Sequence, residues 1–534
     1  MPDLIQSDLP VHLRDRGASA RNETIAGRLS PNASPLERVG ILCLVLLGVA
    51  LRFRQYVFNR SLWFDEANLA LNVAYRDIWT LLTEPLMYLQ TAPPGFLVAA
   101  RAMAVALGTF DWAFRLVTFI AGVSVVLLAV LLARRELTST AARLTFVGLV
   151  ALSPVLIFYS SEFKQYSSDA LAAIAILAAF SYRSSPYGTW LLAGTGFVAL
   201  VWSLPAAFVA APTGLFLLYE AVHSRRYNQV LLVALAWLAG AALHGAHIMQ
   251  VGVHHEFMMG FWRKLGGFPP SPLNSIAAML WYPEAFLRFV YMAFKTPHFA
   301  GPHSDEALSS PAGFGLAIAL AASLALAFIR RRPMGLVAAA AILLTLVASA
   351  FGIYPFSTRL VLFLVPLAFF IMAAAIDAVD FKLGWLPASL CALPLLVMLP
   401  VNLAVLVNPE TPLATEFKKA LRIVARNSIS DDVLAIEPWS GPVFEFYRRD
   451  RAPKLRTFVL NERNTADSML KQAEELLAYA KREGYSRVWY LESIPASPSA
   501  TRLIEEVGDK TPIVFTWRRG GTRLVVFDLA DKPQ

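Results

Sequence analysis

The chain has 534 residues, of which 57% are hydrophobic and only 16% are charged, and its mean hydropathy is +0.53. Soluble globular proteins carry about 25% charged residues, so this composition excludes a string of ordinary soluble domains. The charges are also uneven, because residues 408–534 hold 38 of the 85 charges, about 30% of that stretch against about 12% of the rest. We therefore expect a polytopic membrane protein with a soluble domain at its end.

The formal net charge of +9 falls mostly before residue 408. Its basic residues lie in short loops between apolar runs, where they set membrane orientation and do not form a nucleic-acid patch. The two cysteines, Cys43 and Cys391, both fall inside apolar runs. This excludes a disulfide framework and a cysteine metal site.

Residues 1–38 are polar and have no apolar face, which predicts a disordered cytoplasmic tail and not a cleavable signal. The first apolar run then acts as a signal anchor. Counting runs of near-spanning length gives about eleven predicted transmembrane helices. They lie at 36–56, 113–133, 141–160, 167–182, 187–204, 205–221, 228–250, 311–329, 334–352, 358–378 and 385–407.

A further apolar run at 94–107 decides the topology, because counting it as a span would invert everything after it. If it is left out, the basic residues of the short loops share one side with the N-terminal tail. These are Arg134, Arg135, Arg143, Arg183, Arg225, Arg226, Arg330, Arg331, Arg332 and Lys382. The positive-inside rule puts that side in the cytoplasm, so we expect 94–107 to lie at the outer interface.

This topology divides the chain into the tail, a membrane module at 39–407 and a soluble extracytoplasmic domain at 408–534. The module has large outer loops at 57–111 and 251–310. The soluble domain is expected to be α/β, with strands at 433–437 and 487–491, a helix at 466–482 and a hairpin turning at 519–521. The fold class is thus mainly α, polytopic, with a C-terminal α/β domain.

Asp65 and Glu66 form an acidic pair directly beyond the first span, where a lipid headgroup would lie. A structural alternative is that Asp65 caps a helix over 66–82, with Glu66 favouring the same dipole. The two roles are compatible.

A second group lies between the third and fourth spans. If this segment is helical, Glu162, Tyr166 and Asp169 share one face and Lys164 points elsewhere. Ionisable residues so close to hydrocarbon suggest a functional site, and the alternative is an interfacial lysine with a glutamate partner.

Arg359 lies at the outer mouth of the tenth predicted span, and its planar fork suits a phosphate or pyrophosphate. The alternative for this arginine is a simple headgroup contact. The loop 251–310 carries His254 and His255, which we expect to contact substrate and not to ligate zinc. Its Pro- and Gly-rich part, such as Gly266 to Pro272, suggests substrate contact or a mobile lid. In the soluble domain, Trp439, Tyr447 and Trp517 are predicted to be core aromatics and not sugar-stacking residues.

The order of these motifs resembles the GT-C glycosyltransferases, in particular the bacterial relatives of protein O-mannosyltransferases and lipid A aminoarabinose transferases. The resemblance rests on the acidic pair after the first span, Gln90 to Gly95, Arg115 to Val117, Ser153-Pro154, Glu162 to Asp169, Tyr354 to Arg359 and Asp431 to Leu434. It covers most of residues 40–450. The sequence departs from the family pattern at Lys164, where arginine is commoner, and at Thr91-Ala92.

The resemblance implies an inner-membrane enzyme that moves a sugar from a polyprenyl-phosphate donor to an envelope glycan, lipid or protein on the outer face. It implies Asp65 as general base with Glu66 beside it, Glu162 and Asp169 as further acidic site residues, and Arg359 near the lipid-linked phosphate. Lys164 is a second available cation. Some relatives bind a divalent ion, so Asp65, Glu162 and Asp169 as its oxygen ligands stay an open alternative.

Two rival functions belong to other classes. A transporter or flippase for lipid-linked precursors would place charges in mid-span and show paired halves, whereas here the informative charges cluster at outer span ends. A non-catalytic envelope scaffold would tolerate the loss of the Asp65 charge.

Overall fold

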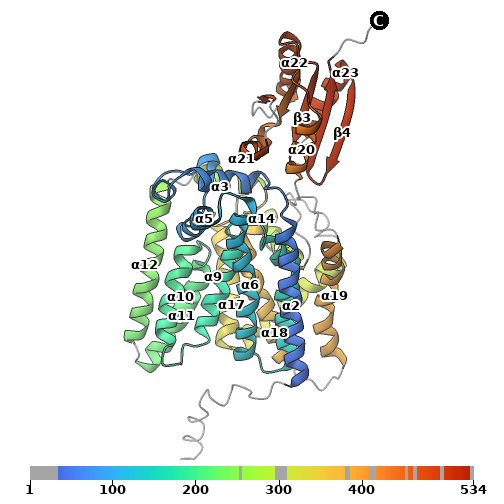
Figure 1. Ribbon diagram of the computed structural model, residues 1–534. Helices are drawn as coiled ribbons and strands as arrows, with labels where there is room; N and C mark the ends of the chain where they lie inside the picture. The colour runs from blue at the N-terminus through green and yellow to red at the C-terminus, as the bar shows by residue number, and fades with distance from the viewer. Residues whose placement is uncertain are drawn as a thin grey trace, which may run out of the picture.

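The computed structural model describes residues 34–225, 227–251, 255–294, 310–378, 385–407, 416–451, 455–460, 466–493 and 498–529. It consists of a helical bundle and a C-terminal α/β domain that stands on one end of the bundle (Figure 1). We call this end of the bundle the domain end, and the other the opposite end. The predicted tail lies outside the described residues except for its last five, and the helix α2 begins there at Pro35.

The apolar runs predicted from the sequence all form helices of the bundle. The long axis of the bundle is built from α2 (Pro35–Phe58), α6 (Asp111–Glu136), α7 (Thr140–Leu152), α8 (Pro154–Tyr159), α9 (Tyr166–Phe180), α10 (Gly188–Trp202), α11 (Ala207–Ser224), α12 (Tyr227–Val251), α16 (Pro311–Arg330), α17 (Pro333–Ala350), η3 (Thr358–Leu364) with α18 (Val365–Ala378), and α19 (Trp385–Val407).

Five helical segments in the described part of the chain are long and apolar enough to cross a membrane, namely α6, α12, α16, α17 and η3 with α18. Several others, such as α9 and α10, are apolar but only 15 residues long. The helices are those of a multi-pass membrane protein, but the predicted count of about eleven spans is not confirmed.

Polar residues begin and end these helices. Ser34 caps α2 and Ser139 caps α7 by accepting hydrogen bonds from backbone N–H groups of the first turn. Pro154 separates α7 from α8, because a proline lacks a backbone donor and fits best in the first turn of a helix, where Pro154 begins α8. The loops at the opposite end also bind one another, since Asp377 accepts from Ser139 and Arg183 pairs with Glu220.

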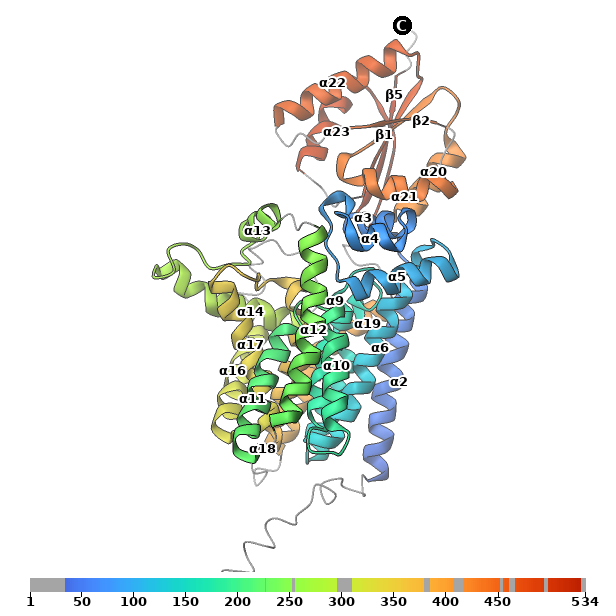
Figure 2. The same ribbon diagram turned by 90° about the vertical axis from the view of Figure 1, so that its left-hand side faces the viewer.

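A layer of short helices covers the domain end. It contains α3 (Phe64–Tyr75), α4 (Ile78–Thr83), η2 (Met87–Leu89) and α5 (Pro94–Leu107). The run at 94–107 is therefore a separate short helix at the end of the bundle, beside α3 and α4 (Figure 2). Its position at the outer membrane interface stays a prediction.

The loop predicted at 251–310 contains two helices that the sequence reading missed, α13 (His255–Lys264) and α14 (Ile276–Phe294). The helix α14 has a largely buried apolar face and packs against α16, α8 and η3. Its Pro283 and the surrounding glycines and prolines hid it, because those residues signal a loop. The segment Gly266 to Pro272, proposed as a mobile lid, lies between these two helices, and its mobility stays a prediction.

The C-terminal domain has a five-stranded sheet in the order β2-β1-β3-β5-β4. The strands are β1 (Asp432–Ile436), β2 (Arg456–Val459), β3 (Arg487–Glu492), β4 (Ile513–Arg519) and β5 (Thr522–Asp528). The first three are parallel, and β4 and β5 form the predicted antiparallel hairpin. The strands β1 and β3, the helix α22 (Ala466–Arg482) and the hairpin confirm the predicted α/β class.

The two faces of this sheet have different neighbours. Val433, Val488 and Val525 face α22 and α23 (Pro498–Lys510), whereas the alternate residues Leu434 and Trp489 face α20 and α21. The second face shares one apolar cluster with the short-helix layer of the bundle. Because side chains alternate between the two faces of the sheet, one face packs against α22 and α23, and the other belongs to the apolar cluster that contacts the membrane module.

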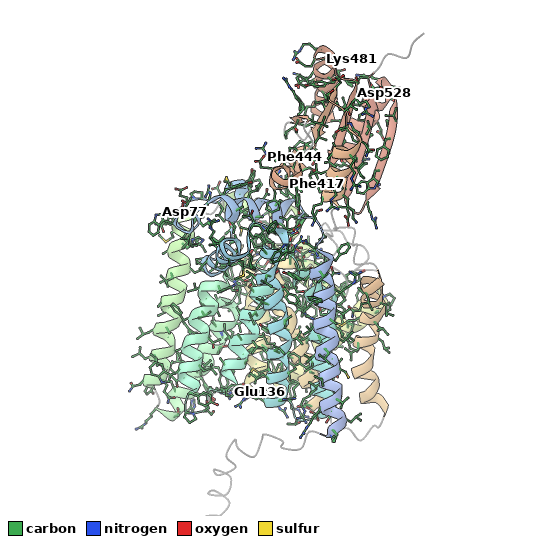
Figure 3. The ribbon with its side chains drawn as sticks, viewed as in Figure 1. Asp77, Glu136, Phe417, Phe444, Lys481 and Asp528 are labelled. Carbon is green, nitrogen blue, oxygen red and sulfur yellow. The ribbon has the colours of Figure 1, made fainter. Side chains whose placement is uncertain are left out.

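The helices α20 (Phe417–Asn427) and α21 (Gly441–Arg451) carry that junction. Phe417 and Phe444 lie at the base of the domain, nearest the bundle, whereas Lys481 and Asp528 lie higher in it (Figure 3). Both phenylalanines belong to the apolar cluster shared with Phe96 and Phe163 of the bundle. Because this contact is apolar and continuous, we treat the domain and the bundle's end as one packing unit.

Candidate active site

A cavity of about 1460 Å³ lies between the domain end of the bundle and the C-terminal domain. Its lining comes from α3 and the loop after it, from α9, α12 and α13, from the segment before η3, and from the ends of β1, β2 and β3. Pockets that hold drug-sized ligands measure about 300–1000 Å³, so this cavity has room for more than one small group.

Asp65 lines the cavity and is the meeting point of two cations. Its Oδ1 lies 2.9 Å from Lys164 Nζ, and its Oδ2 lies 3.1 Å from Arg359 Nη2. These residues come from three separate segments, since Asp65 is in the first turn of α3, Lys164 in the turn before α9 and Arg359 in η3. The fold thus brings together three residues that the sequence singled out.

The prediction that Asp65 caps its helix is wrong. The N-cap position is Trp63, and Glu66 supplies the reciprocal contact by accepting a hydrogen bond from the Trp63 backbone N–H. The helix also ends at Tyr75, earlier than expected, and α4 begins separately with Asp77 as its N-cap. The Asp65 side chain is therefore left to face the cavity.

Arg359 is surrounded by aromatic rings. Its guanidinium carbon lies 5.3 Å from the ring centre of Trp63, 5.6 Å from that of Tyr166 and 5.7 Å from that of Trp262. Cation–π attraction of this kind stabilises a planar cation and fixes its direction. The preceding residue, Thr358, has a φ of +36°, a strained backbone of the sort found at functional sites.

Helical spacing predicted that Lys164 points away from the site, but it points into the site. Residues 160–165 form a turn, and α9 begins only at Tyr166, so the assumed helical face does not exist there. The Lys164 ammonium group instead contacts both Asp65 and the side-chain oxygen of Gln90. Gln90 opens the Gln-Thr-Ala-Pro-Pro-Gly stretch, which accounts for this motif's place in the site.

The pKa of Asp65 lies below its ordinary value. Burial alone raises it, but the positive charges of Lys164 and Arg359 and the hydrogen bonds of Lys164 and Gln90 outweigh that effect. Asp65 is therefore ionised at neutral pH, as a general base must be before it accepts a proton.

Glu66 faces the other way and is fully buried. Its oxygens lie 2.9 Å from Arg115 Nε and 2.7 Å from Arg115 Nη2, and it accepts a hydrogen bond from the Phe163 backbone N–H. This bidentate pair binds α3 to α6 and to the turn at 160–165. The structure therefore gives Glu66 a supporting position behind the cavity wall.

Glu162 and Asp169 form no ion pair with the two cations that bridge Asp65, as far as the described residues show. Glu162 is buried near Arg60, at 3.8 Å, and burial together with the charge of Glu66 raises its pKa to about 7. Asp169 lines the cavity from α9, and its Oδ1 has no hydrogen-bond partner among the described residues. Tyr166 also lines the cavity, on the Arg359 side.

A divalent ion held by Asp65, Glu162 and Asp169 stays an open alternative. Both oxygens of Asp65 already pair with cations, so such an ion would share these oxygens with Lys164 and Arg359 or displace them. Among the described residues, no three His, Cys, Asp or Glu side chains form a metal-binding group. His254 lies outside the described residues, and His255 is described only as the start of α13.

Sequence reasoning missed three contributors to the site. Trp262 reaches Arg359 from α13, and only its aromatic character could have marked it. Arg115 and Glu66 were both singled out, but their pairing was not predicted; a lone charge in an apolar run was the available signal for Arg115. Trp439, predicted to be core, is partly exposed and lines the cavity, whereas Tyr447 is buried as predicted.

No protein-family model matches the sequence, and no curated protein matches it by sequence. The fold and the site together define a class, a multi-pass membrane protein with a charged cavity beneath an α/β domain. Solved structures make this class more specific. The chain is similar to ArnT from Cupriavidus metallidurans in the apo state, with 14% identity, a TM-score of 0.50, and coverage of 90% of this chain and 97% of that one.

ArnT bound to undecaprenyl phosphate matches with 14% identity and a TM-score of 0.53, over 92% of this chain and 99% of that one. Archaeal AglB from Archaeoglobus fulgidus, an oligosaccharyltransferase in complex with an inhibitory peptide and a dolichol-phosphate, matches with 12% identity and a TM-score of 0.49, over 94% and 75% of the two chains. Both relatives are GT-C superfamily members. The chain therefore shares the overall fold of ArnT along nearly its whole length.

Proposed function

We propose that this protein is a membrane glycosyltransferase that transfers a sugar from a polyprenyl-phosphate carrier to an envelope acceptor on the outer face of the inner membrane. The observation that carries the proposal is Asp65 bridged by Lys164 and Arg359 in the cavity wall. A fold shared with a transferase that was crystallised with undecaprenyl phosphate supports it.

In this proposal, the donor phosphate competes with Asp65 for the two cations. Lys164 and Arg359 turn from the carboxylate to the phosphate, because the charged oxygens of a phosphate suit a guanidinium fork and an ammonium group as a carboxylate does. Asp65 then loses the two charges that lower its pKa and becomes a stronger base. Donor binding thereby prepares both the leaving group and the base.

The reaction that follows is a single displacement with inversion. Asp65 takes the proton of an acceptor hydroxyl while that oxygen attacks the anomeric carbon. The bond between this carbon and the phosphate oxygen breaks, and its electron pair stays on the phosphate. Lys164 and Arg359 stabilise the charge that develops on the departing polyprenyl phosphate.

The acceptor reaches the site from the side of the C-terminal domain in this proposal. The domain's part of the cavity lining includes residues that follow β1 and β3, namely Pro438, Trp439 and Ser493. The carboxyl ends of parallel strands are the usual ligand-binding edge of an α/β sheet. A glycan, a lipid or a protein hydroxyl would satisfy this geometry.

Undecaprenyl phosphate binding and sugar transfer from polyprenyl-phosphate donors, measured on purified protein in lipid, test the proposal together. Asp65→Asn should lose transfer but bind undecaprenyl phosphate more tightly, because it releases both cations. Arg359→Ala should weaken that binding about 10- to 100-fold, since it removes a charge-assisted contact. Transfer retained by Asp65→Asn, or binding unchanged in Arg359→Ala, would contradict the roles given to these residues.

A further inference from the structure

The segment 59–64, which leads into Asp65, is bound by side chains of the C-terminal domain. Lys418 Nζ donates to the Asn59 backbone oxygen at 2.7 Å and also pairs with Asp111. The backbone N–H of Lys418 donates to Ser61 Oγ at 3.0 Å. Ser61 therefore accepts from one of the first-turn N–H groups of α20, which have no acceptor within a helix. The two residues are 357 positions apart in sequence.

Tyr447 makes a second link from α21. Its hydroxyl accepts a hydrogen bond from the Leu62 backbone N–H at 2.7 Å and donates to Asp111 Oδ2 at 3.0 Å. The ring is buried beside Phe417 and Phe446. A buried hydroxyl with both its donor and its acceptor role satisfied holds its partners in one arrangement.

The same segment is also bound from the bundle. Arg115 donates to the backbone oxygens of Arg60 and Ser61, and it holds Glu66 by its fork. On the domain side, the Trp439 ring packs edge-on against Phe64, with ring centres 5.0 Å apart. The residues before Asp65 are thus bound by both the bundle and the domain, and the residue after it, Glu66, is bound by the bundle.

We propose that Lys418 and Tyr447 of the C-terminal domain are positioning residues that set the direction of the Asp65 carboxylate through the segment 59–64. This inference rests on the proposed function, because it takes Asp65 as the base. The described lining of the cavity does not include Lys418 or Tyr447. These residues therefore act through the backbone of segment 59–64 and not on substrate.

The size of the effect follows from the geometry that a base requires. A general base must come within hydrogen-bond reach of the acceptor proton, and a misplacement of about 1 Å can cost about 100-fold in rate. The donor phosphate is held by Lys164 and Arg359 from other segments. Loss of the clamp should therefore lower kcat and leave donor affinity nearly unchanged.

The experiment uses the full-length protein in lipid with four single variants. Tyr447→Phe removes only the hydroxyl, and Lys418→Met removes only the ammonium group. Matched controls are Tyr479→Phe, on α22 at the other face of the sheet, and Lys419→Met, the neighbouring exposed lysine. We expect a 10- to 100-fold fall in kcat for the first pair and less than a twofold change for the controls, with undecaprenyl phosphate affinity within threefold of wild type throughout.

A double-variant cycle separates positioning from a general loss of structure. In the Asp65→Asn background, Tyr447→Phe should lower the residual kcat less than twofold, because the group it positions is already absent. An undiminished loss in that background, or equal losses of kcat and donor affinity in the single variants, would overturn the proposal. So would wild-type kcat in both Tyr447→Phe and Lys418→Met while Asp65→Asn is inactive. If Asp65→Asn itself retains full transfer, the proposed function fails first.

Discussion

Asp65 and Asp377 are aspartates at the two ends of the helical bundle, and they have different surroundings. Asp377 accepts hydrogen bonds from the backbone of Thr138 and Ser139 and lies 3.8 Å from Arg332, so it ties loops together. Asp65 has two cations as partners and a cavity of about 1460 Å³ before it, whereas a cavity lined by Arg332 near Asp377's helix measures about 40 Å³.

The difference separates a carboxylate that ties a loop to a helix end from one that faces a cavity. At the opposite end, the Asp377 carboxylate accepts hydrogen bonds from loop N–H groups of Thr138 and Ser139. At the domain end, the same group is paired only with side chains that a ligand can take away. Space beside the charge, and partners that can be exchanged, distinguish the second case.

The largest expected effect comes from exchanging the two aspartates for asparagine. Asp65→Asn should lower sugar transfer by about 100- to 10,000-fold, the usual contribution of a general base. Asp377→Asn keeps the shape of its side chain and should change kcat less than threefold, with a modest loss of thermal stability. Measured side by side in proteoliposomes, equal losses in the two variants would remove the distinction between the two ends.

The next largest effect concerns folding at the domain end. Arg115→Met leaves Glu66 as a buried carboxylate without its main partner, and such a change costs about 3–5 kcal/mol. We expect this variant to unfold at a markedly lower temperature in detergent. The wild-type melting temperature in Arg115→Met would show that the buried pair does not support the wall behind Asp65.

A smaller effect should appear with pH through Glu162. Its folded-state pKa of about 7 lies above the ordinary value of 4.5, so the folded protein binds the proton more tightly than the unfolded chain does. Stability should then fall as pH rises from about 4.5 to 7, by up to about 3 kcal/mol. Glu162→Gln should flatten this dependence in melting curves between pH 5 and 8; an identical slope in the variant would contradict the assignment.

The smallest effect is expected at the opposite end, where Arg183 pairs with Glu220 and both side chains are partly exposed. Pairs of this kind contribute up to about 1 kcal/mol. Arg183→Met should therefore shift the melting temperature only slightly and leave transfer unchanged. If the melting temperature fell as much as in Arg115→Met, the difference in burial would not explain the different contributions of the two ion pairs to stability.

Much of the fold could be predicted, because it depends on local patterns. Apolar runs predicted the helices, and short apolar runs of strand length predicted β1 and β3. The prolines of 266–283 pointed to a loop and concealed α14, whose apolar face is explained only by its neighbours. The number of spans could not be settled, since helices such as α9 are shorter than a bilayer is thick.

The candidate site was predictable in part for the same reason. Isolated charges such as Asp65, Lys164 and Arg359 stood out against apolar surroundings. The pairing of Glu66 with Arg115 depends on contacts across 49 residues, and that of Leu62 with Tyr447 on contacts across 385. The direction of Lys164 was wrong because a turn replaces the assumed helix, and no spacing rule covers that case.

The link between Ser61 and Lys418 has a consequence for how the protein is made. Ribosomes synthesise the segment that holds Asp65 early, and the α20 and α21 residues that bind it emerge more than 350 residues later. Until then, Asn59, Ser61 and Leu62 lack their final partners. Biogenesis would therefore complete the surroundings of Asp65 last, so that a chain still in the translocon is inserted before its cavity wall has its final contacts.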